Sequence, residues 1–145
     1  MKRSEINRSI REALDFLAEH RFPLPEWATW TPPMWNRHGE ECREIRDNAL
    51  GWDVTDFGKG NFSREGLTLF TIRNGNPARD RKTYCEKIMF VREGQVTPIH
   101  FHWHKMEDII NRGGGNVLIR VYNSLPDESI DKVSDVTVHC DGKAY

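Results

Sequence analysis

The sequence predicts a mainly β protein, an antiparallel β-barrel preceded by two α-helical segments. The first 50 residues carry apolar side chains at helical spacing, whereas from Trp52 onward short alternating runs recur about every ten residues. The runs 67–72 and 88–91 are apolar on both faces. A strand that is covered on both sides is typical of a sandwich or a closed barrel, so the sequence favours one of these two architectures.

The helical segments flank a stretch rich in tryptophan. We expect a first helix from about Ser4 to Glu19, with Ser4 as its N-cap and one apolar face made of Ile6, Ile10, Leu14 and Leu17. The next stretch, PEWATWTPPMW, sets three tryptophans among prolines and is expected to lie over the barrel as an arm. A second helix is expected from about Met34 to Leu50, ended by Gly51 at a C-cap position, with His38 exposed.

Residues 51–145 predict a series of strands in one domain that spans residues 1–145, with residues 1–50 as its helical N-terminal arm. The expected strands cover residues 51–58, 66–75, 84–93, 96–104, 116–124 and 134–140. The three glycines at 113–115 can supply the positive φ angles of a tight reversal. The last residues, from Asp141 to Tyr145, predict a hairpin turn and the beginning of a returning strand.

Composition excludes several classes of protein. The 145 residues are 37% hydrophobic and 30% charged, with a net charge of −1, which argues against a surface for nucleic acid or an anionic membrane. The N-terminal residues contain no continuous apolar run, so we expect neither a signal peptide nor a membrane span there. Cys42, Cys85 and Cys140 are odd in number and form no C-x-x-C pair, which favours reduced thiols and a cytoplasmic location.

The segment 94–114, GQVTPIHFHWHKMEDIINRGG, is the candidate functional site. On a strand His100 and His102 point the same way, and a bend at Lys105–Met106 would bring the carboxylate of Glu107 beside them. Two imidazole nitrogens and one carboxylate oxygen form a set of ligands for a divalent metal ion. Two alternatives stay open: the histidines are ordinary residues of a sheet, or the strand continues without a bend and His104 is itself a ligand.

The spacing of this segment resembles the first motif of the cupin superfamily, G-x5-H-x-H-x4-E-x6-G. Gly94, His100, His102, Glu107 and Gly114 occupy its fixed positions. The resemblance implies a cupin-type antiparallel β-barrel, a jelly roll, in which the two histidines and the glutamate hold a metal ion. It also implies a further histidine ligand from a second motif.

Within the cupins, the segments EIRDNALGWDVTDFGKGNF, EGLTLFTIRNG and VTPIHFHWHKMEDIINRGGGN resemble the D-lyxose ketol-isomerase family. The resemblance spans essentially the whole chain. It implies that His100, His102 and Glu107 bind Mn²⁺, and that Lys87 is a catalytic pocket lysine near the hydroxyls of the substrate. Lys87 could instead lie at the barrel mouth with its ammonium group in water.

The resemblance also implies an activity. The expected enzyme is a metal-dependent aldose–ketose isomerase, a homodimer that interconverts D-lyxose and D-xylulose, and also D-mannose and D-fructose, through a metal-bound cis-enediol. The sugar substrate is a small molecule, and no nucleic acid or membrane partner is expected.

The chain departs from the family pattern at its C-terminus. The family continues past the position of Tyr145 through a second motif with the fourth ligand, so we expect the barrel here to be incomplete. Two other functions therefore stay open: a non-catalytic metal-binding cupin fragment, and another cupin enzyme such as a non-haem iron dioxygenase. Imidazole and carboxylate ligands suit manganese, iron or zinc, so the ligand types do not choose among them.

Overall fold

The structure, a computed structural model, describes residues 1–145, which form two compact units, Met1–Pro98 and Ile99–Tyr145. The first unit contains the helical segments and a three-stranded sheet, and the second contains two small strand pairs. The organisation as one cupin domain stays a prediction. None of the helices is long and apolar enough to cross a membrane.

The first helix of the first unit, α1, spans Arg3–Glu19 and agrees with the prediction except at its N-terminus. Its N-cap is Lys2 rather than Ser4, and the backbone N–H of Lys2 donates to Glu5 Oε2 at 2.6 Å. The Glu5 carboxylate thereby satisfies a donor at the helix start, which Ser4 was expected to do. The buried residues of α1 are Ser9, Ala13 and Leu17, so of the predicted apolar face only Leu17 is fully buried, and Ile6, Ile10 and Leu14 are half-buried.

The second predicted helix was wrong as one continuous element. The chain instead forms three short helical pieces there, which are α2 (Pro32–Trp35), η2 (Glu40–Cys42) and α3 (Arg43–Asp47), while a further piece, η1 (Glu26–Thr29), lies in the preceding arm. The interruption falls at Gly39, whose ψ of −126° lies outside the helical range. Gly51, expected to end this helix, instead begins the first strand, while Asn48 caps α3.

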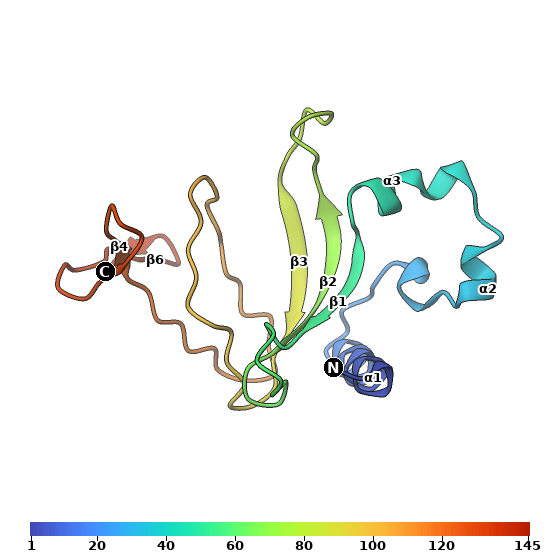
Figure 1. Cartoon of the computed structure of the whole chain (residues 1–145), viewed down its shortest axis with the longest axis horizontal. Helices are drawn as coiled ribbons and strands as arrows, with labels where there is room; N and C mark the ends of the chain where they lie inside the picture. Colours follow the sequence, from blue (N-terminus) through green and yellow to red (C-terminus); the bar gives the residue numbers. More distant parts are fainter. The chain divides into compact units, whose positions relative to one another are not determined.

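Three antiparallel strands follow, in the order β1-β2-β3 (Figure 1). They are β1 (Gly51–Thr55), β2 (Leu67–Asn74) and β3 (Cys85–Phe90), and they confirm the first three predicted strands. In the register, Trp52 lies opposite Phe70, and Phe70 lies opposite Ile88. A shift between Thr71 and Arg73 marks a bulge in β2.

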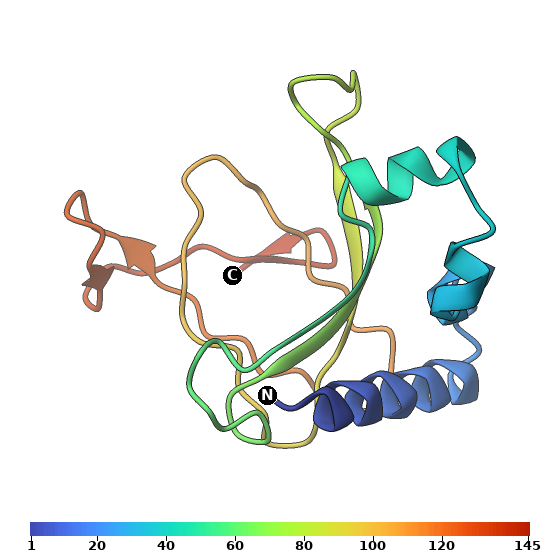
Figure 2. The same cartoon turned by 45° about the vertical axis from the view of Figure 1, so that its right-hand side comes forward.

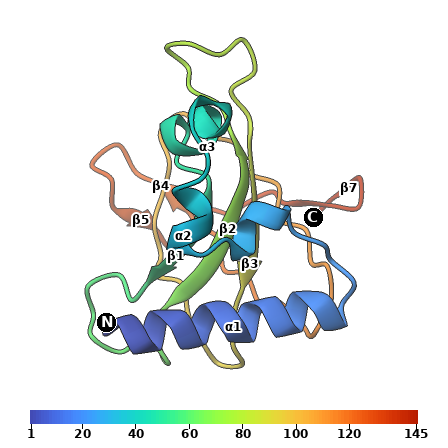
Figure 3. The ribbon, with the colours of Figure 1, turned by 90° about the vertical axis from the view of Figure 1, so that its right-hand side faces the viewer.

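The helical segments pack against one face of this sheet. Figures 2 and 3 show α1 crossing the strands on the side where α2 and α3 also lie. Phe70 is 0% exposed, and its ring lies 4.8 Å from that of Trp27 and 5.1 Å from that of Trp52. Phe16 of α1 lies 5.1 Å from Phe90. These aromatic contacts confirm that the tryptophan-rich arm packs on the sheet.

Burial differs between the central strand and the edge strand. Residues 67–71 of β2 are all buried, as the run of apolar residues on both faces predicts. In β3, however, Met89 is 48% exposed, and so is Val91, which follows the strand. Because β3 is an edge strand, side chains of a neighbouring strand flank it on one side only, and it is more exposed than the central strand β2.

A set of side-chain contacts holds the loop that follows β3. Arg92 Nε donates to Glu12 Oε2 of α1 at 3.1 Å, and the buried Gln95 donates to the carbonyl of Phe62 at 2.6 Å. Gly94 between them has a φ of +70°, a conformation that glycine adopts without steric cost. The first glycine of the motif is therefore required by the backbone.

The second unit contains less strand structure than predicted. Its strands are two residues long and pair as β4 (Asn123–Ser124) with β5 (Ile130–Asp131), and as β6 (His139–Cys140) with β7 (Lys143–Ala144). The predicted strand 96–104 does not form, and those at 116–124 and 134–140 form only at their ends. No strand of the described chain pairs with residues 99–122, and a strand is stable only when a neighbour satisfies its backbone groups.

Two predicted reversals are confirmed in this unit. Gly113 and Gly114 have φ angles of +137° and +87°. Asp141 and Gly142, between β6 and β7, have φ angles of +49° and +78°, as expected for a two-residue hairpin turn. The chain is thus mainly antiparallel β with helices at its N-terminus, without a closed barrel, as an incomplete β fold requires.

Replacing Phe70 by alanine should destabilise the first unit by about 3–5 kcal/mol, because the change opens a cavity between two tryptophan rings. Urea unfolding followed by tryptophan fluorescence measures the loss. Phe57→Ala, at an exposed position, is the matched control and should stay within about 0.5 kcal/mol of the wild type. A Phe70→Ala loss as small as the control's would contradict the packing described here.

Acid should destabilise the junction between α3 and the β2–β3 loop. Hydrogen bonds from Arg43 and Arg79, at 3.0 and 2.8 Å, lower the pKa of Asp47. A carboxyl with a lowered folded-state pKa stabilises the fold above its unfolded pKa of about 3.9, and this contribution disappears as the pH falls through the folded pKa. Arg79→Met should lower the melting temperature at pH 6 and should reduce the further fall between pH 6 and pH 3. Arg81→Met on the same loop, the control, should follow the wild-type profile.

Candidate metal centre

His100, His102 and Glu107 lie together in the second unit. One ligand atom from each lies within 4.8 Å of the others. The two imidazole rings are 5.0 Å apart at an interplanar angle of 79°, and His102 Nε2 is 3.6 Å from Glu107 Oε2. The structure thus brings together the three residues that the sequence singles out as ligands.

From His100 to Trp103 the side chains alternate between two sides of the backbone, as in an extended chain. Phe101 and Trp103 also pair, with their rings 5.1 Å apart at an angle of 86°. Odd and even residues therefore gather separately, as on a strand, although no neighbouring strand is bonded to this segment. The shared direction of the imidazoles comes from the local backbone.

A bend brings the carboxylate back toward the rings, but it lies earlier than expected. The chain turns at Trp103–His104 rather than at Lys105–Met106. His104 is thereby left outside the group of ligand atoms that contains Glu107. The bend explains why Glu107, rather than His104, lies beside the two imidazole rings.

Lys105 is a member of this cluster that the sequence analysis missed. Its ammonium group forms an ion pair with Glu107 Oε1 and donates a hydrogen bond to His102 Nε2 at 3.4 Å. The hydrogen bond from Lys105 is the main reason that the pKa of Glu107 is lowered. A lysine two residues before an expected ligand was the only signal in the sequence.

The residues present fit a divalent cation. The imidazole of His102 and the ionised carboxylate of Glu107 already hold one positive charge, the ammonium of Lys105. The side chains of His102 and Glu107 are 33% and 41% exposed, so an ion can reach them from solvent. Bond lengths of about 2.0–2.2 Å to such ligands would require the three side chains to close in by about 1 Å.

Lys87 lies in the first unit, on β3 opposite Thr71 of β2. By the alternation of the strand, it shares its side of the sheet with Met89, away from Ile88 and Phe90 on the helix-covered side. Lys87 is exposed. Its position on the side of the sheet opposite the helices is compatible with both readings of this lysine, a pocket residue or one with its ammonium group in water.

Comparison with known proteins identifies the class. The sequence profile of the D-lyxose isomerase family matches residues 1–145. The chain is 48% identical, over 145 residues, to a D-lyxose/D-mannose isomerase of Escherichia coli O157:H7, and 46% identical to one of Serratia proteamaculans. Each alignment covers 98% of this chain and 63% of the relative.

These matches are to sugar isomerases, as the resemblance of the motifs implied. The chain belongs to the D-lyxose isomerase family. It spans less than two thirds of the length of the relatives that it matches.

Removing the charge of Lys105 should strengthen metal binding at this cluster, because a divalent ion must displace the ammonium group from Glu107 and His102. An exposed ion pair contributes about 0.2–1 kcal/mol, so Lys105→Met should lower the dissociation constant for Mn²⁺ by roughly one and a half- to fivefold. Isothermal titration calorimetry measures this change. Lys132→Met, in the same unit, is the control; weaker binding by Lys105→Met would show that the lysine holds Glu107 in place instead.

Proposed function

We propose that the protein is a metal-dependent aldose–ketose isomerase that interconverts D-lyxose and D-xylulose, and D-mannose and D-fructose. Its family membership and the names of its relatives, which are D-lyxose/D-mannose isomerases, support this activity. The observation that carries the proposal is the convergence of His100, His102 and Glu107.

The proposed metal site consists of these three side chains, with Mn²⁺ as the ion. The ligand set of two nitrogens and one oxygen contains no sulfur, which suits Mn²⁺ better than a thiolate site would. When bound, such an ion acts as a Lewis acid that stabilises negative charge on the substrate oxygens and orients them. This role answers the central difficulty of the reaction, since a proton on carbon next to a carbonyl is only weakly acidic.

The remaining steps belong to the protein's own groups. A base must move a proton between C1 and C2 of the open-chain sugar, and it must lie within hydrogen-bond reach of both carbons. Glu107 is a poor base in this proposal because its lone pairs face the cation. Lys87 is proposed to donate a hydrogen bond to a substrate oxygen, supported by its exposed position on the side of the sheet opposite the helices.

We further propose that the protein works in the cytoplasm and as a homodimer, with a cupin-type barrel as its complete fold. Its three cysteines are free, which is compatible with a reducing compartment. The order β1-β2-β3 leaves β3 as an edge strand. Further strands of a barrel would cover that edge.

The proposal is tested with the protein together with any residues that follow Tyr145 in its reading frame. D-lyxose should be converted to D-xylulose, a chelator should abolish the conversion, and Mn²⁺ should restore it. His102→Ala and Glu107→Gln should each lower kcat/KM by roughly a hundredfold or more, since the loss of a ligand costs at least as much as the loss of a supporting contact.

His104→Gln is the matched control for these variants, because His104 is adjacent to the cluster and outside it. It should keep wild-type kcat/KM. Absence of any D-lyxose or D-mannose turnover with Mn²⁺ would exclude the isomerase. Metal binding without turnover would then favour the non-catalytic cupin, and oxygen consumption with Fe²⁺ would favour the dioxygenase.

A further inference from the structure

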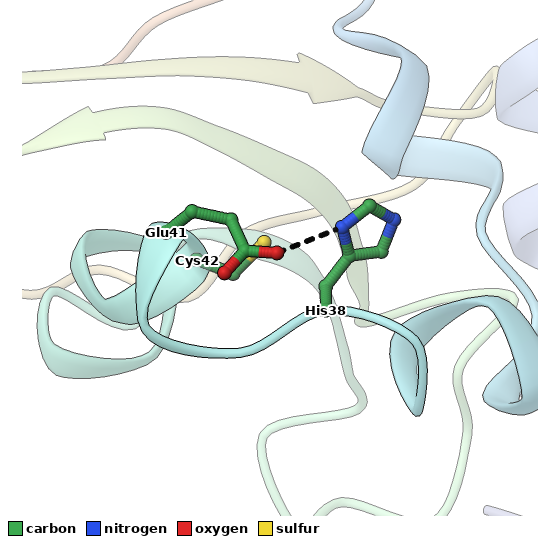
Figure 4. A group of neighbouring side chains, drawn as sticks. All are labelled: His38, Glu41 and Cys42. Carbon is green, nitrogen blue, oxygen red and sulfur yellow. Dashed lines mark hydrogen bonds and ion pairs between the residues drawn. The ribbon is translucent and has the colours of Figure 1, made fainter.

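A second group of ligand atoms lies in the first unit, between α2 and α3. His38 precedes η2, and Glu41 and Cys42 belong to η2. One ligand atom from each residue lies within 4.8 Å of the other two. Figure 4 shows the Glu41 carboxylate directed at the His38 ring, with the sulfur of Cys42 beside the carboxylate. The sequence analysis treated His38 only as an exposed residue and Cys42 only as a reduced thiol.

The imidazole of this group is held in a fixed orientation. The His38 ring stacks on Trp30 at 4.0 Å with an interplanar angle of 6°, and Trp30 packs edge-on against Trp35 at 4.9 Å. His38 Nδ1 lies 3.2 Å from Glu41 Oε1. Because the stacked ring cannot turn freely, a cation that replaces this hydrogen bond meets a ring nitrogen already in place.

The carboxylate is also held and ionised. Glu41 Oε2 accepts a hydrogen bond from the backbone N–H of Gly39 at 3.0 Å. Hydrogen bonds from its own backbone N–H and from that of Gly39 lower the pKa of Glu41. The second oxygen, Oε1, faces the imidazole and is the atom that a cation between them would bind.

Cys42 supplies the buried side of the group. Cys42 is 4% exposed and forms no disulfide, whereas Cys85 and Cys140 are exposed. The three ligands thus range from the exposed Glu41, through the partly exposed His38, to a sulfur in the interior. An ion bound here would enter from the side of the carboxylate.

We propose that His38, Glu41 and Cys42 bind Zn²⁺ or a divalent ion of similar softness. A thiolate, an imidazole and a carboxylate are the ligand types of tetrahedral zinc sites, and water completes the fourth position. Zinc bonds of about 2.0–2.3 Å place ligand atoms roughly 3.3–3.8 Å apart, so the group closes by about 1 Å when it binds. Binding releases the thiol proton of Cys42, whereas the His38 imidazole binds through Nδ1 and keeps its one proton on Nε2.

The sulfur ligand gives this site a different metal preference from the cluster of His100, His102 and Glu107. Soft thiolate ligands favour Zn²⁺ over Mn²⁺, while a set of nitrogen and oxygen ligands accepts either ion. All three ligands of the zinc site come from residues 38–42 of the first unit, and they share no residue with the proposed catalytic cluster. The two sites can therefore be tested separately.

Absorption spectroscopy with Co²⁺, a substitute for Zn²⁺, tests for the thiolate ligand. The protein should show a sulfur-to-cobalt charge-transfer band in the near ultraviolet, and Zn²⁺ should remove it. Cys42→Ser should abolish the band, whereas Cys85→Ser and Cys140→Ser, the matched controls at exposed cysteines, should keep it. No band in the wild type, or a band that survives Cys42→Ser, would overturn the proposal.

A second measurement does not alter the buried cysteine. In a His100→Ala, His102→Ala, Glu107→Gln background, calorimetry should still find one Zn²⁺ bound per chain. Adding Glu41→Gln or His38→Gln should weaken this binding by roughly tenfold or more, since even a supporting contact contributes this much. Glu40→Gln, next to the site, should leave it unchanged. Equal zinc affinity in all these variants would overturn the proposal, and circular dichroism verifies that each variant is folded.

Discussion

The packing of Phe70 between Trp27 and Trp52 is the contact on which the first unit depends. It joins the central strand of the sheet to the arm that follows α1. Trp52 also donates from Nε1 to the carbonyl of Ala28 at 2.8 Å, so the same side chain fixes the arm by a hydrogen bond. Because the arm carries Trp30, on which His38 stacks, the geometry of the second ligand group depends on this aromatic core.

The part of the fold that could be predicted is the part stabilised by local pattern and neighbouring strands. The strands β1, β2 and β3 follow one another along the chain, and each finds its partner next in sequence. Residues 96–104 have an equally clear alternation but form no strand, because alternation sets which side chains share a face and not which strand lies beside them. The prediction of one continuous second helix was wrong, because a helical pattern of side chains does not reveal a non-helical backbone angle such as the ψ of Gly39.

The candidate centre was predictable to a similar degree. His100, His102 and Glu107 were identified from spacing, and they do converge. The position of the bend could not be predicted, because the bend lies at Trp103–His104, where no glycine or proline indicates a turn. Lys105 was missed because its importance comes from where its long side chain reaches, and an ammonium on a flexible stem can reach many places.

The proximity of the three proposed ligands and the proposed isomerase activity have different structural requirements. The ligands lie within eight consecutive residues, so a short chain closure brings them together at small entropic cost, even where no strand forms. Catalysis requires more, because reacting groups must be held to within a fraction of an ångström by a surrounding shell. In the described chain, His102 and Glu107 remain partly open to solvent, and the ammonium of Lys105 compensates the carboxylate. A local motif therefore suffices to gather a candidate cation site, whereas a water-excluding cavity requires further elements packed around that site.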